Sequence, residues 1–297
     1  MRRIPAESLL LGTVLLWSFN FTAIRYGLTH GFEPLAYAPL RWGLAGVALA
    51  GLARWRGHSL LVGRRDLAFL AAASVIGVFV NQVSFVYAVR LVSASTVALV
   101  FGTLPIFVSL ISQLSGLERL RPRHWVATGV SFTGVAFVAA GASGGLSASA
   151  GGIALALVTT STFAVYSVMV VPVMRRHSPV VVNAVTALVG AAMLAVASST
   201  VLAHESWGKP GALAWGALLY SALISIALGN VFWFTAIERV GPGRASLFAN
   251  LQPFLGALFA VLVLSESLSR SQVAGGCVIA VGILLGRRTR LPAAPSE

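Results

Sequence analysis

Charge is scarce in this chain of 297 residues, of which only 10% are Asp, Glu, Lys or Arg while 57% are apolar. A soluble domain of this size needs far more charge to cover its surface. The scarcity therefore excludes an ordinary soluble globular protein. It places the chain in a lipid bilayer, where apolar side chains can face the surrounding hydrocarbon.

Cysteine and paired catalytic groups are also lacking. The single cysteine, Cys277, excludes an internal disulfide bond and a cysteine metal site. The five histidines fall in or beside predicted loops, and none has an acid at the spacing of a metal site or a catalytic triad. We therefore expect no metal, no cofactor and no catalytic residue. A membrane-embedded enzyme, such as a lipid-modifying transferase, is the least favoured function class.

Acidic residues are absent from the interiors of the apolar runs. All eight fall in predicted loops or at helix ends, at Glu7, Glu33, Asp66, Glu118, Glu205, Glu238, Glu266 and Glu297. A carrier that exchanges protons for cations needs a carboxylate within the membrane. The sequence offers no such group, so facilitated movement of a solute down its gradient is favoured.

Apolar runs long enough to cross a bilayer, which takes roughly 20 residues, are what this chain has in abundance. Ten can be placed, at residues 7–27, 34–53, 67–89, 93–114, 124–141, 151–171, 179–202, 211–237, 244–264 and 271–286. We predict an all-α integral membrane protein with ten transmembrane helices, surrounded by the lipid bilayer.

Basic residues gather on alternate connections between these runs. Sixteen of the 21 lie on the side that carries both termini, four lie on the other side, and Arg41 lies inside a run. Basic residues accumulate in cytoplasmic loops, so we predict that both termini are cytoplasmic. The net charge of +13 then reflects topology, and we expect no nucleic-acid partner.

A sequence pattern repeats after 148 residues. The matched pairs include Pro105 with Pro253, Glu118 with Glu266, and Gly134 with Gly282. Residues 1–146 and 147–297 thus form two repeats of five helices. An odd number of helices inverts the second repeat relative to the first, which predicts two halves facing each other across a central pathway.

Polar and aromatic side chains inside the runs are the candidate substrate-binding residues, because polar groups are costly against lipid and should face inward. The set is Trp17, Asn20, Gln82, Tyr87, Tyr166, Asn230, Trp233 and Asn250. Amides can bond both ends of a zwitterion, while rings can hold an apolar side chain. Any single member could instead be a contact between helices.

Three further residues carry specific expectations. Arg41 could bond backbone carbonyls or Glu33, or could serve as the counter-charge of a carboxylate substrate. Pro105 and Pro253 each permit a helix kink, which serves either a gating motion or packing alone.

These features together resemble the drug/metabolite transporter superfamily, in its ten-helix branch of two EamA-type repeats. The resemblance is carried by Trp17-Ser-Phe-Asn20 with Arg25, by Pro34 followed by Arg41, and by the repeated proline, glutamate and glycine. It implies a carrier of the bacterial inner (plasma) membrane that exports small metabolites and works as a monomer. Within that branch the chain is similar to bacterial exporters of aromatic amino acids.

Two transport functions stay open at this point. The first is export of aromatic or other apolar amino acids by alternating access, through the candidate set. The second is exchange of anionic metabolites or nucleotide sugars, with Arg25 and Arg41 as anion ligands.

Overall fold

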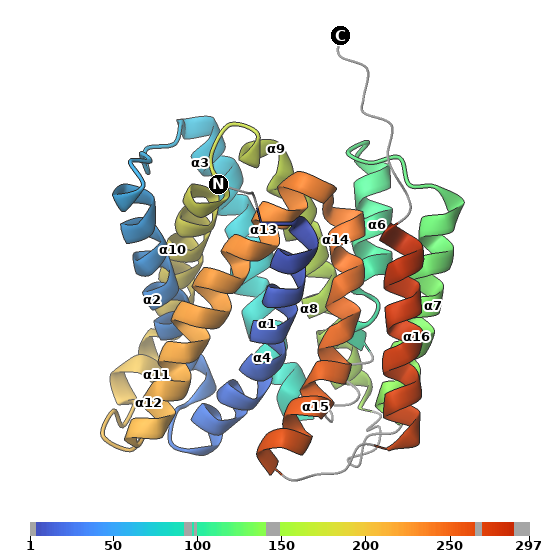
Figure 1. Cartoon of the computed structure of the whole chain (residues 1–297). Coiled ribbons are helices and arrows are strands. Elements are labelled where there is room, and N and C mark those ends of the chain that lie inside the picture. The colour runs from blue at the N-terminus through green and yellow to red at the C-terminus, as the bar shows by residue number, and fades with distance from the viewer. Residues whose placement is uncertain (1–3, 92–96, 98–99, 141–148, 265–268, 288–297) are drawn as a thin grey trace.

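The computed structural model describes residues 4–91, 97, 100–140, 149–264 and 269–287. All regular secondary structure in these ranges is helical (Figure 1). The first half holds α1 (Ala6–Thr29), α2 (Pro34–Trp55), α3 (Arg64–Ser74), the π-helix η1 (Val75–Val80), α4 (Asn81–Leu91), α6 (Leu104–Leu114) and α7 (Pro122–Ala140).

The second half holds α8 (Ala150–Met169), α9 (Val171–Met174), α10 (Pro179–Ala197), α11 (Ser199–His204), α12 (Ala212–Leu219), the π-helix η2 (Tyr220–Leu228), α13 (Gly229–Val240), α14 (Pro242–Ser246), the 3-10 helix η3 (Leu247–Leu251), α15 (Gln252–Leu264) and α16 (Arg270–Arg287). The predicted boundary between the halves, at residues 146 and 147, lies outside the described residues.

Six helical segments of the described chain are long and apolar enough to cross a membrane. They are Ala6–Thr29, Pro34–Trp55, Arg64–Ala88, Ala150–Met174, Pro179–Ala197 and Ala212–Val240. Large apolar side chains such as Leu11, Leu114 and Val281 are exposed, as a lipid-facing surface requires. The chain is therefore a multi-pass membrane protein.

Small hydroxyl side chains fill much of the interior. Ser74 and Thr160 are fully buried, and each donates its hydroxyl to the carbonyl four residues earlier in its own helix. This bond satisfies a polar group without any partner from another helix. These buried hydroxyls therefore carry no unsatisfied polar group into the interior.

Element boundaries recur along the chain at one interval. The starts of α3 and α12, of α4 and α13, of α6 and α15, and of α7 and α16 are each 148 positions apart. The π-helices η1 and η2 both end directly before an equivalent helix, α4 or α13. The sequence repeat thus has a counterpart in the backbone.

The two halves interlock through specific helix pairs. Helix α1 packs on α12, η2 and α13, while α8 packs on η1 and α4. Helix α2 pairs with α10, and α7 pairs with α16, which run side by side in Figure 1. Every long helix of one half therefore has neighbours in the other half.

Candidate functional site

Three aromatic rings from three helices meet inside the bundle. Trp17 of α1 lies 5.1 Å from Trp233 of α13 and 5.6 Å from Phe163 of α8, measured between ring centroids. Phe163 and Trp233 are 6.2 Å apart. These separations are those of interacting aromatic pairs. We call Trp17, Phe163 and Trp233 the aromatic cluster; it joins helices of both halves.

The Trp17 ring is fixed by the π-helix η2. Its indole Nε1 donates to the Ser225 carbonyl at 3.1 Å. A Cβ on Gly229 would lie only 2.8 Å from the same nitrogen, so the close approach of α1 to α13 depends on the glycine. The Trp17 ring fits at this position because Gly229 has no side chain that would collide with it.

Tyr166 borders the aromatic cluster, with its ring centroid 6.5 Å from that of Phe163. It is 1% exposed, and its hydroxyl shares a hydrogen bond of 2.9 Å with Thr186 Oγ1 of α10. A Cβ on Gly77 in η1 would overlap the Tyr166 ring. Each π-helix therefore receives an aromatic side chain from the other half.

Arg41 is buried in α2 with 4% of its surface exposed. Its Nη1 donates to Ser221 Oγ of η2 at 3.2 Å, and its Nη2 donates to Gln82 Oε1 of α4. Its guanidinium carbon lies 5.7 Å from the centre of the Tyr37 ring. Arg41 was expected to bond Glu33 or backbone carbonyls. Its hydrogen bonds in the described structure go instead to these two neutral side chains.

A chain of hydrogen bonds leads on from Arg41 to the second half. Gln82 Nε2 donates to Asn81 Oδ1 at 3.0 Å. Asn81 Nδ2 in turn donates to the Thr159 carbonyl of α8 at 2.7 Å. Arg41 is thus connected to η2 directly and to α8 through two amides.

The amides of the candidate set have different surroundings. Asn20 lies one turn from Trp17 on α1 and its Oδ1 is buried without a hydrogen-bond partner, as is the Nε1 of Trp233. Asn230 is 6% exposed on α13. Unpartnered buried polar atoms are costly, so the Asn20 and Trp233 atoms are the candidates in this set for bonding a polar ligand.

Two members of the candidate set lie apart from the aromatic cluster. Asn250 donates from Nδ2 to Ser131 Oγ of α7 at 2.9 Å, which is a contact between helices. Tyr87 is 41% exposed on α4. Among the described residues, neither makes a ring contact or a hydrogen bond with the cluster.

Both prolines stand at the start of an α-helix. Pro105 lies in the first turn of α6, directly after a turn at Gly102 and Thr103. Pro253 is the second residue of α15 and follows the 3-10 helix η3. A proline in a first turn sacrifices no hydrogen bond, while the backbone before each proline departs from the α-helix. The Arg25 side chain lies outside the described part of the structure.

Phe163 of the aromatic cluster was not in the predicted set, and neither were three residues near it, Tyr37, Ser221 and Ser225. Tyr37 lies one helical turn before Arg41, so its spacing could have identified it. Ser221 and Ser225 belong to a run of small and apolar residues with no distinguishing signal. Their roles depend on the π-helical backbone of η2, which the sequence does not indicate.

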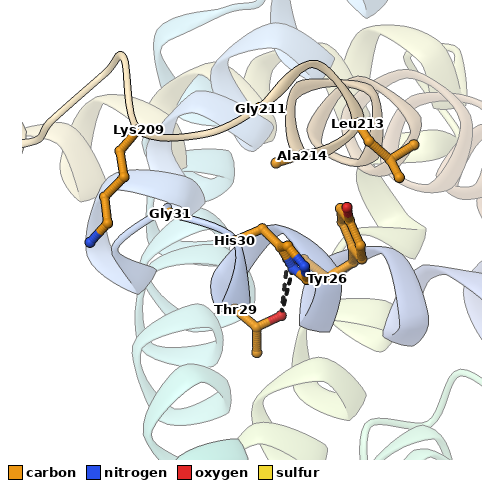
Figure 2. A pocket seen from close by; sticks show the side chains of 8 residues that line it. All are labelled: Tyr26, Thr29, His30, Gly31, Lys209, Gly211, Leu213 and Ala214. Atoms are coloured by element: carbon orange, nitrogen blue, oxygen red, sulfur yellow. Dashed lines mark hydrogen bonds between the residues drawn. The ribbon is translucent and has the colours of Figure 1, made fainter.

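The two ends of the bundle differ. At the end that carries the N-terminus, ion pairs join the halves, Arg176 to Asp66 at 2.6 Å and Arg244 to Glu7 at 3.0 Å. The opposite end is hollowed by two open pockets of about 340 and 440 Å³ that share Gly31 and Lys209. Figure 2 shows the first pocket, where the Tyr26 and His30 rings stack 3.8 Å apart.

Known proteins resemble the chain over almost its whole length. An uncharacterized transporter of Archaeoglobus fulgidus is 26% identical over 94% of this chain and 97% of its own. A protein of Streptantibioticus cattleyicolor named as a probable terminal-alkyne amino-acid exporter is 27% identical over 97% of this chain and 96% of its own.

A solved structure shares the fold. It is a crystal structure 21% identical in sequence, with a TM-score of 0.82, covering 95% of this chain and 98% of the other. The family model described as the EamA-like transporter family matches residues 4–140 and again residues 150–287. The chain therefore belongs to the EamA-like transporter family, within the drug/metabolite transporter superfamily.

Proposed function

We propose that this transporter exports amino acids with aromatic or other apolar side chains. The observation that carries the proposal is the aromatic cluster, in which the buried Trp233 and the partly buried Trp17 and Phe163 join the two halves, with Asn20 one turn from Trp17. Rings of this kind bind apolar side chains, and amides bind ammonium and carboxylate groups. The amino-acid exporter named among the relatives supports the same substrate class.

The proposed binding set is that expected from the sequence: Trp17, Asn20, Gln82, Tyr87, Tyr166, Asn230, Trp233 and Asn250. Trp17, Trp233 and Tyr166 would hold the side chain, since they form or border the aromatic cluster. Asn20 and Trp233 would contribute polar atoms that have no partner inside the protein. Tyr87 and Asn250 would join only in another conformation of the transport cycle.

For the architecture we propose ten transmembrane helices in two inverted repeats, residues 1–146 and 147–297, with both termini in the cytoplasm. The constant spacing of equivalent helix starts supports a repeat. An inversion is supported by Figure 1, where α3 lies at the top of the bundle and its equivalent α12 at the bottom. The charge asymmetry of the connections supports the cytoplasmic placement of the termini. Placement in a bacterial inner (plasma) membrane is what the family membership implies.

Alternating access is the mechanism that we propose. In support of it, ion pairs join the halves at the end that we assign to the cytoplasm, while the two described pockets lie at the other end. Pro105 and Pro253 adjoin irregular backbone that can bend when the halves move. No acid that could carry a proton is among the described partners of the aromatic cluster or of Arg41. The substrate is therefore expected to move down its own gradient. Both halves belong to one chain, so a monomer suffices.

Exchange of anionic metabolites is the second candidate function, and Arg41 favours it. A buried cation without an acidic partner attracts an anion. Arg25 and Arg41 would be the ligands of an anionic metabolite or of a nucleotide sugar. Catalysis is not proposed, because the relatives are named as transporters.

The test is a substrate screen in proteoliposomes, run with and without an imposed pH difference. We expect flux of labelled phenylalanine, tryptophan or leucine above that of empty vesicles, with no requirement for the pH difference. Flux of nucleotide sugars or organic anions alone would favour the second function. Absence of flux for every amino acid would contradict the proposal.

A further inference from the structure

The Arg41 charge lacks a counter-charge inside the bundle. No acid pairs with it among the described residues, and its guanidinium contacts are the neutral oxygens of Gln82 and Ser221. Its Nε is buried and has no hydrogen-bond partner. A buried, unpaired cation is strongly unfavourable, so its presence calls for an anion that is bound during transport.

One donor of this cation is unused, because the Arg41 Nε is buried and has no hydrogen-bond partner. The Tyr37 hydroxyl, one turn earlier in α2, lies beside Ser221, the same side chain that accepts from Arg41 Nη1. An ionised carboxylate offers only acceptors, about four in all. A guanidinium is its best partner, because the planar group can donate two parallel bonds to the two carboxylate oxygens.

Arg41 and the aromatic cluster contact the same stretch of η2. Arg41 bonds Ser221 and Trp17 bonds Ser225, four residues and about one turn later in that helix. The cation and the rings are therefore close enough to bind two parts of one small molecule.

We propose that Arg41 binds the α-carboxylate of the exported amino acid, while the aromatic cluster holds its side chain. This inference rests on the proposed function. It states that the carboxylate end of the zwitterion is the end bound by an opposite charge. The carboxylate takes the place of Gln82 as the acceptor of the guanidinium, with Tyr37 as a further donor. A substrate must then carry a carboxylate at its α-carbon, and it needs neither a nucleotide nor a phosphate group.

Competition in wild-type proteoliposomes tests the assignment without any variant. Labelled phenylalanine flux is measured against unlabelled 3-phenylpropionate, which keeps the carboxylate, and phenylalaninamide, which lacks it. We expect inhibition by 3-phenylpropionate and none by the amide at equal concentration. Inhibition by the amide as strong as that by phenylalanine would overturn the inference.

A variant pair adds a second readout. In Arg41→Gln we expect the KM for phenylalanine to rise about tenfold to a hundredfold, as for loss of a charged hydrogen bond. Arg54→Gln is the matched control, an exposed arginine at the end of the same helix. A wild-type KM in Arg41→Gln would overturn the inference while leaving amino-acid export intact.

These experiments distinguish a failure of the carboxylate assignment from a failure of the proposed amino-acid export. If Arg41→Gln does not fold, Arg41→Lys keeps the charge but loses the two parallel bonds, and its KM should still rise. If the wild-type protein moves no amino acid at all, the proposed function fails and the carboxylate assignment fails with it.

Discussion

Trp233 is the most enclosed ring of the aromatic cluster, at 1% exposure. It touches Trp17 of the first half and Phe163 of the second, so it forms part of the contact between the halves. Its indole Nε1 lacks a partner within the protein. One side chain therefore contributes both an apolar face and a polar atom to the proposed site.

Replacing Trp233 by leucine should lower the transport efficiency for phenylalanine and tryptophan roughly tenfold, equivalent to the ~1.4 kcal/mol expected for a lost ring contact. Trp55→Leu is the control, because Trp55 is 82% exposed at the end of α2. Initial flux in proteoliposomes measures both. Equal flux in Trp233→Leu and Trp55→Leu would contradict the binding role of the cluster.

Glu118 is a buried carboxylate in the connection between α6 and α7, with 7% exposure. Its Oε2 accepts a hydrogen bond of 2.8 Å from the Gly243 N–H, and the Ser112 hydroxyl also lies beside the carboxylate. A Cβ on Gly241 would overlap Oε1. Burial raises the pKa of Glu118 above its ordinary 4.5, and the hydrogen bonds from Gly243 and Ser112 offset only part of that rise.

The raised pKa has a definite consequence for stability. Between 4.5 and the raised value, the folded protein binds more protons than the unfolded chain, so stability increases as the pH falls through this range. Above the raised pKa the full penalty of a buried charge is present. We predict that lowering the pH from 7 to ~4.5 shifts the melting temperature of the wild type in a more stabilising direction than that of Glu118→Gln.

The measurement is thermal unfolding in detergent across this pH range. Glu238→Gln serves as the control, because Glu238 is exposed on α13. The control should keep the wild-type pH dependence. Identical profiles for Glu118→Gln and the wild type would show that Glu118 does not have the raised pKa in the folded protein.

At the scale of elements, α7 and α16 approach each other through glycines. A Cβ on Gly134 would lie 2.7 Å from the Gly275 carbonyl oxygen, and one on Gly282 would lie 2.7 Å from the Ser131 nitrogen. These obstacles are backbone atoms, which cannot rotate away. The separation of the two helices is therefore set by residues without side chains.

Gly134→Val should lower the stability by about 1–3 kcal/mol, the usual cost of overpacking. Gly129→Val makes the same change on the same helix where no atom lies within 4 Å of the added Cβ. Thermal unfolding of the two variants isolates the packing cost. A Gly134→Val protein as stable as Gly129→Val would contradict the close approach.

Helix positions followed from the sequence more fully than helix geometry did. The predicted runs at 34–53 and 151–171 coincide closely with α2 and α8, because apolar length alone determines a span. The π-helices η1 and η2 were not predicted. Their backbone depends on contacts between the halves, such as Tyr166 against Gly77, and no local pattern records such a contact.

In the candidate site, too, some features could be predicted from the sequence and others could not. Trp17, Tyr166 and Trp233 could be predicted and are brought close together, since rings and amides within spans must face inward. Asn250 fits the same reasoning, yet it bonds Ser131 instead. Inward orientation is encoded by polarity, whereas the partner of each side chain depends on which helices are neighbours.

At the scale of the whole molecule, the account depends on two halves of opposite orientation. The first turns of α7 and α16 are equivalent positions in the repeat, yet the charge pattern leads us to assign Arg121 before α7 to the cytoplasmic side and Arg270 at the start of α16 to the other side. Both residues are exposed. They can therefore report directly on the side of the membrane that each helix start faces.

The decisive measurement is cysteine accessibility in intact cells, with Arg121→Cys and Arg270→Cys each introduced into a Cys277→Ala background. A maleimide that cannot cross the membrane should label the Arg270→Cys protein from outside. It should label the Arg121→Cys protein only after the membrane is opened. Labelling of both positions from the same side would contradict the inverted repeat and the central pathway that it encloses.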